Sequence, residues 1–103
     1  MPAKTTDPDW VAVAGRRATV PAHVTAREMG EETIVLNLRS GAYHGLDPVG
    51  ARFFAVLRDG VTLEQAADTL AREYGEAVER IRSDLWTFCG SLRDAGLIVL
   101  TDG

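Results

Sequence analysis

The side chains that could act as a nucleophile or a general base are few in this chain. Cys89 is the only cysteine, and the two histidines are His23 and His44. A cysteine nucleophile needs a base within hydrogen-bonding reach. Cys89, however, lies in a predicted helix beside Phe88 and one turn from Leu85, a setting typical of a buried, inert thiol. We therefore expect no catalytic residue and predict that the protein is not an enzyme.

Metal ions and phosphate groups also lack a suitable set of residues. A structural zinc site needs several thiolates or imidazoles at defined spacing, and the sequence has none. The glycines at 41, 45 and 50 lack the spacing and the following lysine of a phosphate-binding loop. Charges of both signs are spread along the predicted third helix at spacings of three and four residues, which is typical of a solvated helix face: Glu76, Glu79, Arg80, Arg82, Asp84, Arg93 and Asp94. We expect no metal and no cofactor.

The composition is that of an ordinary soluble domain. The 103 residues suffice for one small core, with 46% hydrophobic and 25% charged residues. The net charge of −4 argues against a nucleic-acid partner, because affinity for phosphate backbones depends on clustered cations. No apolar run is long enough to span a membrane, and no secretory signal is evident. We therefore expect a cytoplasmic protein without a membrane partner.

Alternating apolar and polar residues predict three short strands in the segments HVTARE, TIVLNL and AYHGL. In the second segment Ile34, Leu36 and Leu38 share one face, and Val35 and Asn37 are expected to point away. The turn RSG before the third strand puts a glycine where positive φ is needed. These strands are predicted to form an antiparallel meander.

The period then changes to that of helices. The first helix is predicted to begin at the N-cap Asp47, with Pro48 in the first helical position. Thr62 and Gln65 form a capping box for the second helix, and the third is expected over residues 77–95. The order βββααα predicts an α+β fold, a winged helix-turn-helix-like domain with a three-stranded antiparallel meander followed by three helices.

The N-terminal segment shows no sustained period. We interpret residues 1–20 as a flexible arm and residues 21–103 as the folded domain. Trp10, Val11 and Val13 are an exception, since an apolar cluster in a tail usually docks. It could add a strand to a sheet edge, cover a groove or pack on a second copy.

Two functions suit three helices beside a small sheet. The first is capture of an extended peptide at the third strand, whose second edge is free unless the N-terminal arm covers it. The second is a small acidic winged-helix protein that binds DNA or acts as a regulator. The third helix, EAVERIRSDLWTFCGSLRDAG, offers three arginines against four carboxylates, and the sheet precedes the helices. The peptide hypothesis is therefore preferred.

The strongest family signals are the strand–turn–strand LNLRSGAYHGL, the helix start LDPVGARFF and the final DLWTFCGSLRDAGLI. In this order and spacing, over roughly residues 22–100, the chain resembles the PqqD-like family, the recognition elements for ribosomally made, modified peptides. Within that family it most resembles the stand-alone leader-binding proteins of lasso-peptide biosynthesis. The resemblance implies a non-catalytic protein that holds the N-terminal leader of a precursor peptide as an added strand, between the third strand and the third helix. The partners it implies are the precursor leader, a leader peptidase acting in trans and a cyclase.

Carried over by position, the resemblance assigns peptide-binding residues to the third strand and to one flank of the third helix. Counting 100° per residue puts Leu85 behind this flank and Arg80 at its rim. Asp84 could accept a hydrogen bond from a leader hydroxyl or pair with a leader cation. Trp86, on the opposite flank, is expected to pack against another helix rather than to contact a partner. The predicted peptide-binding residues are Ala42, Tyr43, His44, Gly45, Leu46, Ala77, Arg80, Ile81, Asp84, Leu85 and Phe88.

Overall fold

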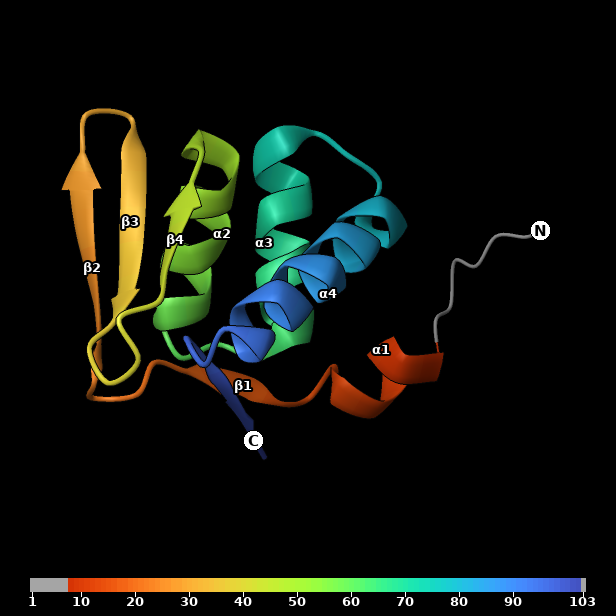
Figure 1. Cartoon of the computed structure of the whole chain (residues 1–103). Helices are drawn as coiled ribbons and strands as arrows, with labels where there is room; N and C mark the ends of the chain where they lie inside the picture. The colour runs from red at the N-terminus through yellow and green to blue at the C-terminus, as the bar shows by residue number, and fades with distance from the viewer. Residues whose placement is uncertain (1–7, 103) are drawn as a thin grey trace.

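The computed structural model describes residues 8–102 (Figure 1). Side chains are described from residue 10 onward. Two small sheets and four helices make up this part of the chain. In chain order the elements are α1 (Pro8–Val13), β1 (Arg17–Thr19), β2 (Val24–Met29), β3 (Glu32–Asn37), β4 (Tyr43–Leu46), α2 (Pro48–Arg58), α3 (Leu63–Tyr74), α4 (Val78–Asp94) and β5 (Val99–Thr101). The predicted meander followed by three helices is confirmed, as β2–β3–β4 and α2–α3–α4.

The helices begin and end where local sequence signals placed them. The Asp47 carboxylate accepts a hydrogen bond from the Gly50 N–H at 2.8 Å and caps α2. Thr62 and Gln65 form both bonds of a capping box at α3. Gly75 ends α3 with φ of 65°, a left-handed conformation that glycine adopts without strain. These caps fix where α2 begins and where α3 begins and ends, and both helices contribute residues to the site described below.

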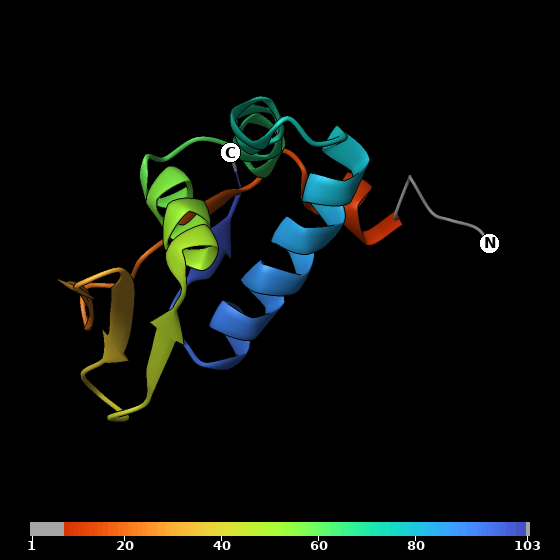
Figure 2. The ribbon, with the colours of Figure 1, turned by 90° about the horizontal axis from the view of Figure 1, so that it is seen from above.

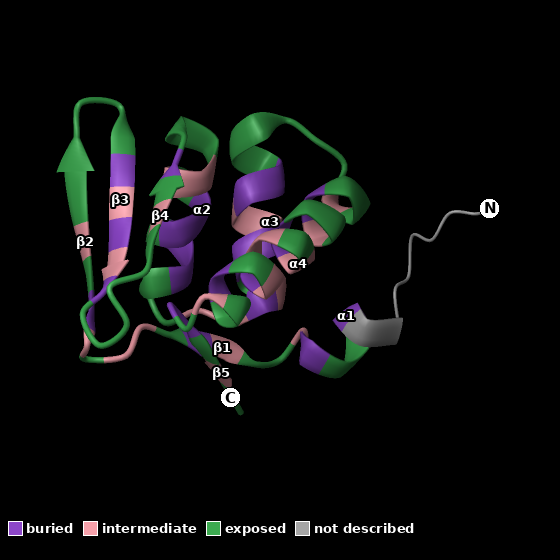
Figure 3. Cartoon of the chain, in the orientation of Figure 1, coloured by how far each residue is buried: buried purple, intermediate pink, exposed green. Residues whose placement is uncertain are grey.

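The buried face of β3 is opposite to the one predicted from the sequence. Val35 is fully buried and Asn37 is 6% exposed, whereas Ile34 and Leu36 are half-buried and Leu38 is 61% exposed. Figure 3 shows this alternation of buried and half-buried residues along β3. Both sets fit a strand period, so only packing decides between them. The inner set packs toward α2, and the amide of Asn37 is buried there because it finds hydrogen-bond partners.

The N-terminal segment differs from the expected loose arm. Residues 1–7 lie outside the described residues, but from Pro8 onward the chain forms a helix and a strand that pack on the domain. Trp10 and Val13 are buried, and β1 pairs antiparallel with β5. The register joins Arg17 to Thr101, so this sheet ties the two ends of the described chain together. The sequence analysis offered three ways for the N-terminal segment to dock, and pairing of a strand with the C-terminal tail was not among them.

The core lies in the helical layer between the meander and α1. α2 packs against the sheet on one side and against α3 on the other, and α4 packs on α3 (Figures 1 and 2). The fully buried side chains include Leu57, Leu70 and Leu92. Trp86 is half-buried and packs against this core, as expected, with the guanidinium of Arg93 5.9 Å from its ring centroid.

Candidate functional site

β4 is an edge strand of the meander. It pairs with β3 on one side, in the register Leu36↔Tyr43, Val35↔His44, Ile34↔Gly45 and Thr33↔Leu46. Within residues 8–102 no strand pairs with its other side, because the sheet order is β2-β3-β4. The docked N-terminal segment lies elsewhere, in the β1–β5 sheet. An open strand edge of this kind is a template for another extended chain.

The hydrogen-bond alternation of the ladder identifies which backbone groups face the open edge. The Asn37 N–H donates to the Ala42 carbonyl at 2.8 Å, so this pair is of the hydrogen-bonded type. Such pairs recur at every second residue of an antiparallel ladder. In the observed register they fall on His44 and Leu46. The N–H and C=O groups of Tyr43 and Gly45 therefore point away from β3.

A hollow of about 230 Å³ lies between this edge and α4. It is lined by residues of β4, of the start of α2 and of the C-terminal half of α4: His44, Gly45, Leu46, Asp47, Gly50, Phe88 and Ser91. We call it the β4 hollow. In the view of Figure 2, β4 and the C-terminal half of α4 are seen beside each other below α2.

A second hollow of about 290 Å³ continues along the same flank of α4. It is lined by residues of α2, the end of α3, the loop that follows and the first half of α4: Val49, Phe53, Tyr74, Glu76, Arg80, Ile81 and Asp84. We call it the α2 hollow, and the two hollows together the groove. Phe53 lines one and Phe88 lines the other, and their rings meet edge to face with centroids 5.6 Å apart. This aromatic pair separates the two hollows.

Glycine at position 50 allows α2 to begin close to α4. A Cβ there would lie 3.4 Å from Cε1 of Phe88 and 3.4 Å from Oδ1 of Asp47, at the near limit of ordinary van der Waals contact. A side chain larger than a methyl group would therefore need the capped end of α2 or the Phe88 ring to shift, which would change the shape of the β4 hollow.

The charges along the groove are solvent-exposed and mixed in sign. Arg80 and Asp84 are one helical turn apart, with their closest N and O atoms at 3.9 Å. Exposed pairs of this type contribute little to stability. They remain available to a guest, and Glu76 adds a second carboxylate to the α2 hollow.

The structure brings seven of the predicted residues to the two hollows: His44, Gly45, Leu46, Arg80, Ile81, Asp84 and Phe88. Four others do not line them. Leu85 is fully buried in the core, and Tyr43 is 71% exposed on the outer face of the sheet. Ala42 lies in the turn before β4, and Ala77 is the N-cap of α4.

Residues of α2 and α3 in the groove were missed by the sequence analysis. Val49 is half exposed, Phe53 is buried, and both line the α2 hollow. The other lining residues outside the predicted set are Asp47, Gly50, Tyr74, Glu76 and Ser91. The available signal was the apolar spacing of Val49 and Phe53, one helical turn apart at the start of α2.

On the opposite side of α4, the carboxylate of Glu64 forms a hydrogen-bonded bridge between helices. The indole N–H of Trp10 and the guanidinium of Arg82 donate to the two oxygens of Glu64, at 3.1 and 2.7 Å. The bond from Arg82, and next that from Trp10, hold the pKa of Glu64 below its usual range against the opposing effect of burial. The bridge links α1, α3 and α4 on the side away from β4.

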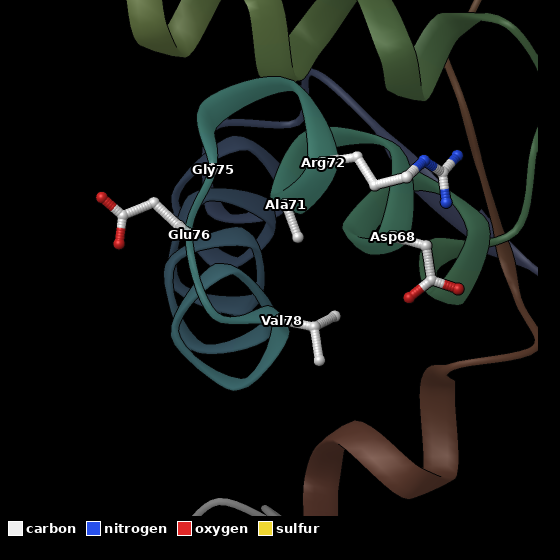
Figure 4. A pocket seen from close by; sticks show the side chains of 6 residues that line it. All are labelled: Asp68, Ala71, Arg72, Gly75, Glu76 and Val78. Atoms are coloured by element: carbon white, nitrogen blue, oxygen red, sulfur yellow. The ribbon is translucent and has the colours of Figure 1, made fainter.

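A third hollow, of about 280 Å³, lies where the end of α3 meets the start of α4 (Figure 4). Its lining residues are Asp68, Ala71, Arg72, Gly75, Glu76 and Val78. Figure 4 shows the Glu76 side chain directed away from Asp68 and Arg72. None of the predicted peptide-binding residues lines it, so we assign it no part in the groove.

Cys89 does not offer a nucleophile. Its thiol is buried in the core, and burial raises its pKa to about 12, so that it is protonated at neutral pH. Among residues 8–102 no group of three potential metal ligands comes together. Over the same range, no helix is both long enough and apolar enough to cross a bilayer.

An open-edged meander next to three helices defines the class as a small winged-helix-like domain, and comparisons with known proteins identify the family. The family model described as coenzyme PQQ synthesis protein D (PqqD) matches residues 32–98. This range is more than half of the chain, so the chain belongs to the PqqD family, as the sequence resemblance suggested. A search of curated proteins finds no match.

Two solved structures are similar to this chain. The structure of TbiB1 in complex with the TbiA(beta) leader peptide has a TM-score of 0.72 at 29% identity, covering 78% of this chain and 93% of that chain. The structure of lasso peptide synthetase B1 complexed with its leader peptide has a TM-score of 0.74 at 22% identity, covering 81% and 98%. The second likeness, at this identity, concerns the fold alone. Both support the α+β architecture predicted from the sequence.

Proposed function

We propose that this chain binds the leader region of a ribosomally made precursor peptide, of the lasso-peptide type, and presents it to separate processing enzymes. The leader adds to β4 as an antiparallel strand, with side chains in the groove beside α4. The chain itself performs no chemical step. It acts in the cytoplasm, where such precursors are made, with a leader peptidase in trans and a cyclase as further partners.

The observation that carries this proposal is the open edge of β4. The backbone groups of Tyr43 and Gly45 face away from β3, and within the described residues no strand covers them. An added strand satisfies these groups, while alternate guest side chains enter the β4 and α2 hollows. The similar structure of TbiB1 is a complex with a leader peptide, which supports a leader as the guest.

The charge distribution on α4 disfavours the alternative of DNA binding. Arg80 pairs with Asp84, and Arg82 pairs with Glu64. Arg93 lies over the Trp86 ring. Affinity for phosphate backbones needs an excess of clustered cations, and the carboxylates of Asp84 and Glu64 lie beside two of these three arginines.

The test is a calorimetric titration with a synthetic leader. The first probe is the leader of any short precursor whose gene is found next to the gene for this chain, and the second is the TbiA(beta) leader. A dissociation constant in the micromolar range or below, about −8 kcal/mol or better, is expected for the first probe. Salt-dependent binding of duplex DNA without affinity for that leader would contradict the proposal.

Amide hydrogen exchange locates the added strand. On binding, the amides of Tyr43 and Gly45 should gain protection, because a guest strand accepts their hydrogen bonds. The amide of His44 serves as an internal control, since the ladder already pairs it with β3. Equal changes at all three positions would contradict strand addition at this edge.

A further inference from the structure

Asn37, at the end of β3, organises the turn that leads into β4. Its side-chain oxygen accepts hydrogen bonds from the backbone N–H groups of Arg39 at 2.9 Å and Ser40 at 3.2 Å. Its backbone N–H donates to the Ala42 carbonyl, and its backbone carbonyl accepts from the Gly41 N–H, both at 2.8 Å. One buried residue therefore fixes the course of the chain immediately before the open edge.

The same side chain reaches the end of α4. Its Nδ2 group donates to the carbonyl oxygen of Gly96 at 3.4 Å. Gly96 has φ of 72°, and a Cβ at this position would lie 3.0 Å from Nδ2 of Asn37. Glycine is thus required both for the backbone conformation and for the close approach of Asn37.

This contact joins the two walls of the β4 hollow. One wall is β4, which follows the turn built by Asn37, and the other is the C-terminal half of α4, which ends just before Gly96. The packing of Gly50 and Phe53 against Phe88 in the groove is apolar, so it tolerates small shifts. A hydrogen bond is directional and fixes relative position more strictly.

We propose that Asn37 is a positioning residue for leader binding, which sets the separation between the β4 edge and α4 without touching the guest. This inference rests on the proposed function. Without the bond to Gly96, the separation between β4 and the C-terminal half of α4 is less strictly fixed. The free energy needed to restore that separation on binding then lowers the affinity for the guest peptide.

The test compares variants that break the link with variants that leave it intact. Asn37→Asp retains the oxygen that accepts from Arg39 and Ser40 but loses the donor to Gly96. Ser40→Ala removes only the hydroxyl that accepts from the Ala42 N–H at 3.1 Å, within the same turn. Glu64→Gln weakens the bridge on the far side of α4. The melting temperature and the leader dissociation constant are measured for each.

Asn37→Asp is expected to weaken leader binding about tenfold, because it removes the donor and places a carboxylate oxygen against the Gly96 carbonyl. Ser40→Ala and Glu64→Gln should stay within about twofold of the parent chain, even where they lower the melting temperature as much. Gly96→Ala breaks the link from the α4 side and should also weaken binding. The double variant should lose less than the two separate losses combined, because both remove one contact.

Three results separate the possibilities. Folded Asn37→Asp that binds the leader like the parent chain would overturn the inference while leaving the proposed function intact. Additive losses for Asn37→Asp and Gly96→Ala, or an equal loss in Glu64→Gln, would also overturn it, since general destabilisation then explains the effect. A parent chain that binds no leader would overturn the proposed function and this inference together.

Discussion

The ring of Phe88 meets the ring of Phe53 edge to face, with centroids 5.6 Å apart and ring planes at 77°. This contact joins α4 to α2 and forms the partition between the two hollows. Aromatic pairs of this geometry contribute about 0.5–1.5 kcal/mol beyond the area they bury. Both rings thus serve stability and the shape of the groove at once.

Phe88→Ala should merge the two hollows and remove this contact. We expect the free energy of unfolding to fall by about 2 kcal/mol, since Phe88 is only half-buried, and leader affinity to fall about tenfold. Phe88→Leu, which keeps an apolar floor, is the matched control and should retain most of the affinity. Urea denaturation and calorimetric titration measure the two quantities. Unchanged affinity in Phe88→Ala would exclude this ring from the site.

Two substitutions of Gly45 separate backbone pairing from side-chain space. Gly45→Pro removes the N–H that faces the open edge and should weaken leader binding more than tenfold. Gly45→Ala retains the N–H, and its methyl group would lie 3.7 Å from Cδ1 of Ile34, an ordinary contact. The alanine variant should therefore bind within about threefold of the parent chain. Similar losses in both would argue against a guest strand paired with this residue.

The Glu64 bridge predicts a pH dependence of stability. The pKa of Glu64 is lowered in the folded chain, chiefly by Arg82, so its contribution is complete above the ordinary glutamate pKa of 4.5. That contribution is lost as the pH falls through the lower folded value. Glu64→Gln should lower the melting temperature by about 3–6 °C at pH 7, and the difference should shrink below pH 4. Calorimetric scans at several pH values check this, and a gap that widens in acid would refute it.

The Cys89 thiol should be unreactive in the folded chain. With its pKa raised to about 12 and its side chain buried, alkylation by iodoacetamide at pH 8 is expected only after unfolding in urea. Mass spectrometry follows the modification. Cys89→Ala should leave leader binding unchanged, and any activity that disappears with this substitution would show that the chain is an enzyme after all.

The sequence was informative where the determinants of structure are local. Asp47, and Thr62 with Gln65, mark helix starts through contacts within four residues, and each was identified correctly. The β1–β5 sheet was missed because it pairs residues 84 positions apart, as in the bond from Thr101 to the Arg17 carbonyl. Strands of three residues leave no period to detect.

The groove could be predicted in part for the same reason. Helical spacing put Ile81, Asp84 and Phe88 on one flank, which depends only on the 3.6-residue repeat. It could not exclude Leu85, because burial depends on where α2 and α3 pack. The prediction of the buried face of β3 was wrong because a polar residue such as Asn37 is expected to face solvent. Its burial is explained only by its hydrogen bonds to the distant Gly96 carbonyl and to the following turn.

The backbone N–H and C=O groups along β4 point alternately toward β3 and toward the open edge, and this alternation determines which guest sequences can bind. Within β4, only Tyr43 and Gly45 have backbone N–H and C=O groups that are free to pair with a guest strand. If the guest strand shifted its register by one residue, the side chains that had faced the groove would point to the opposite face of the sheet. A slip of two residues would restore the facing but exchange the occupants of the hollows. The leader sequences that this chain binds should therefore have similar side chains at every second position and vary freely at the positions between.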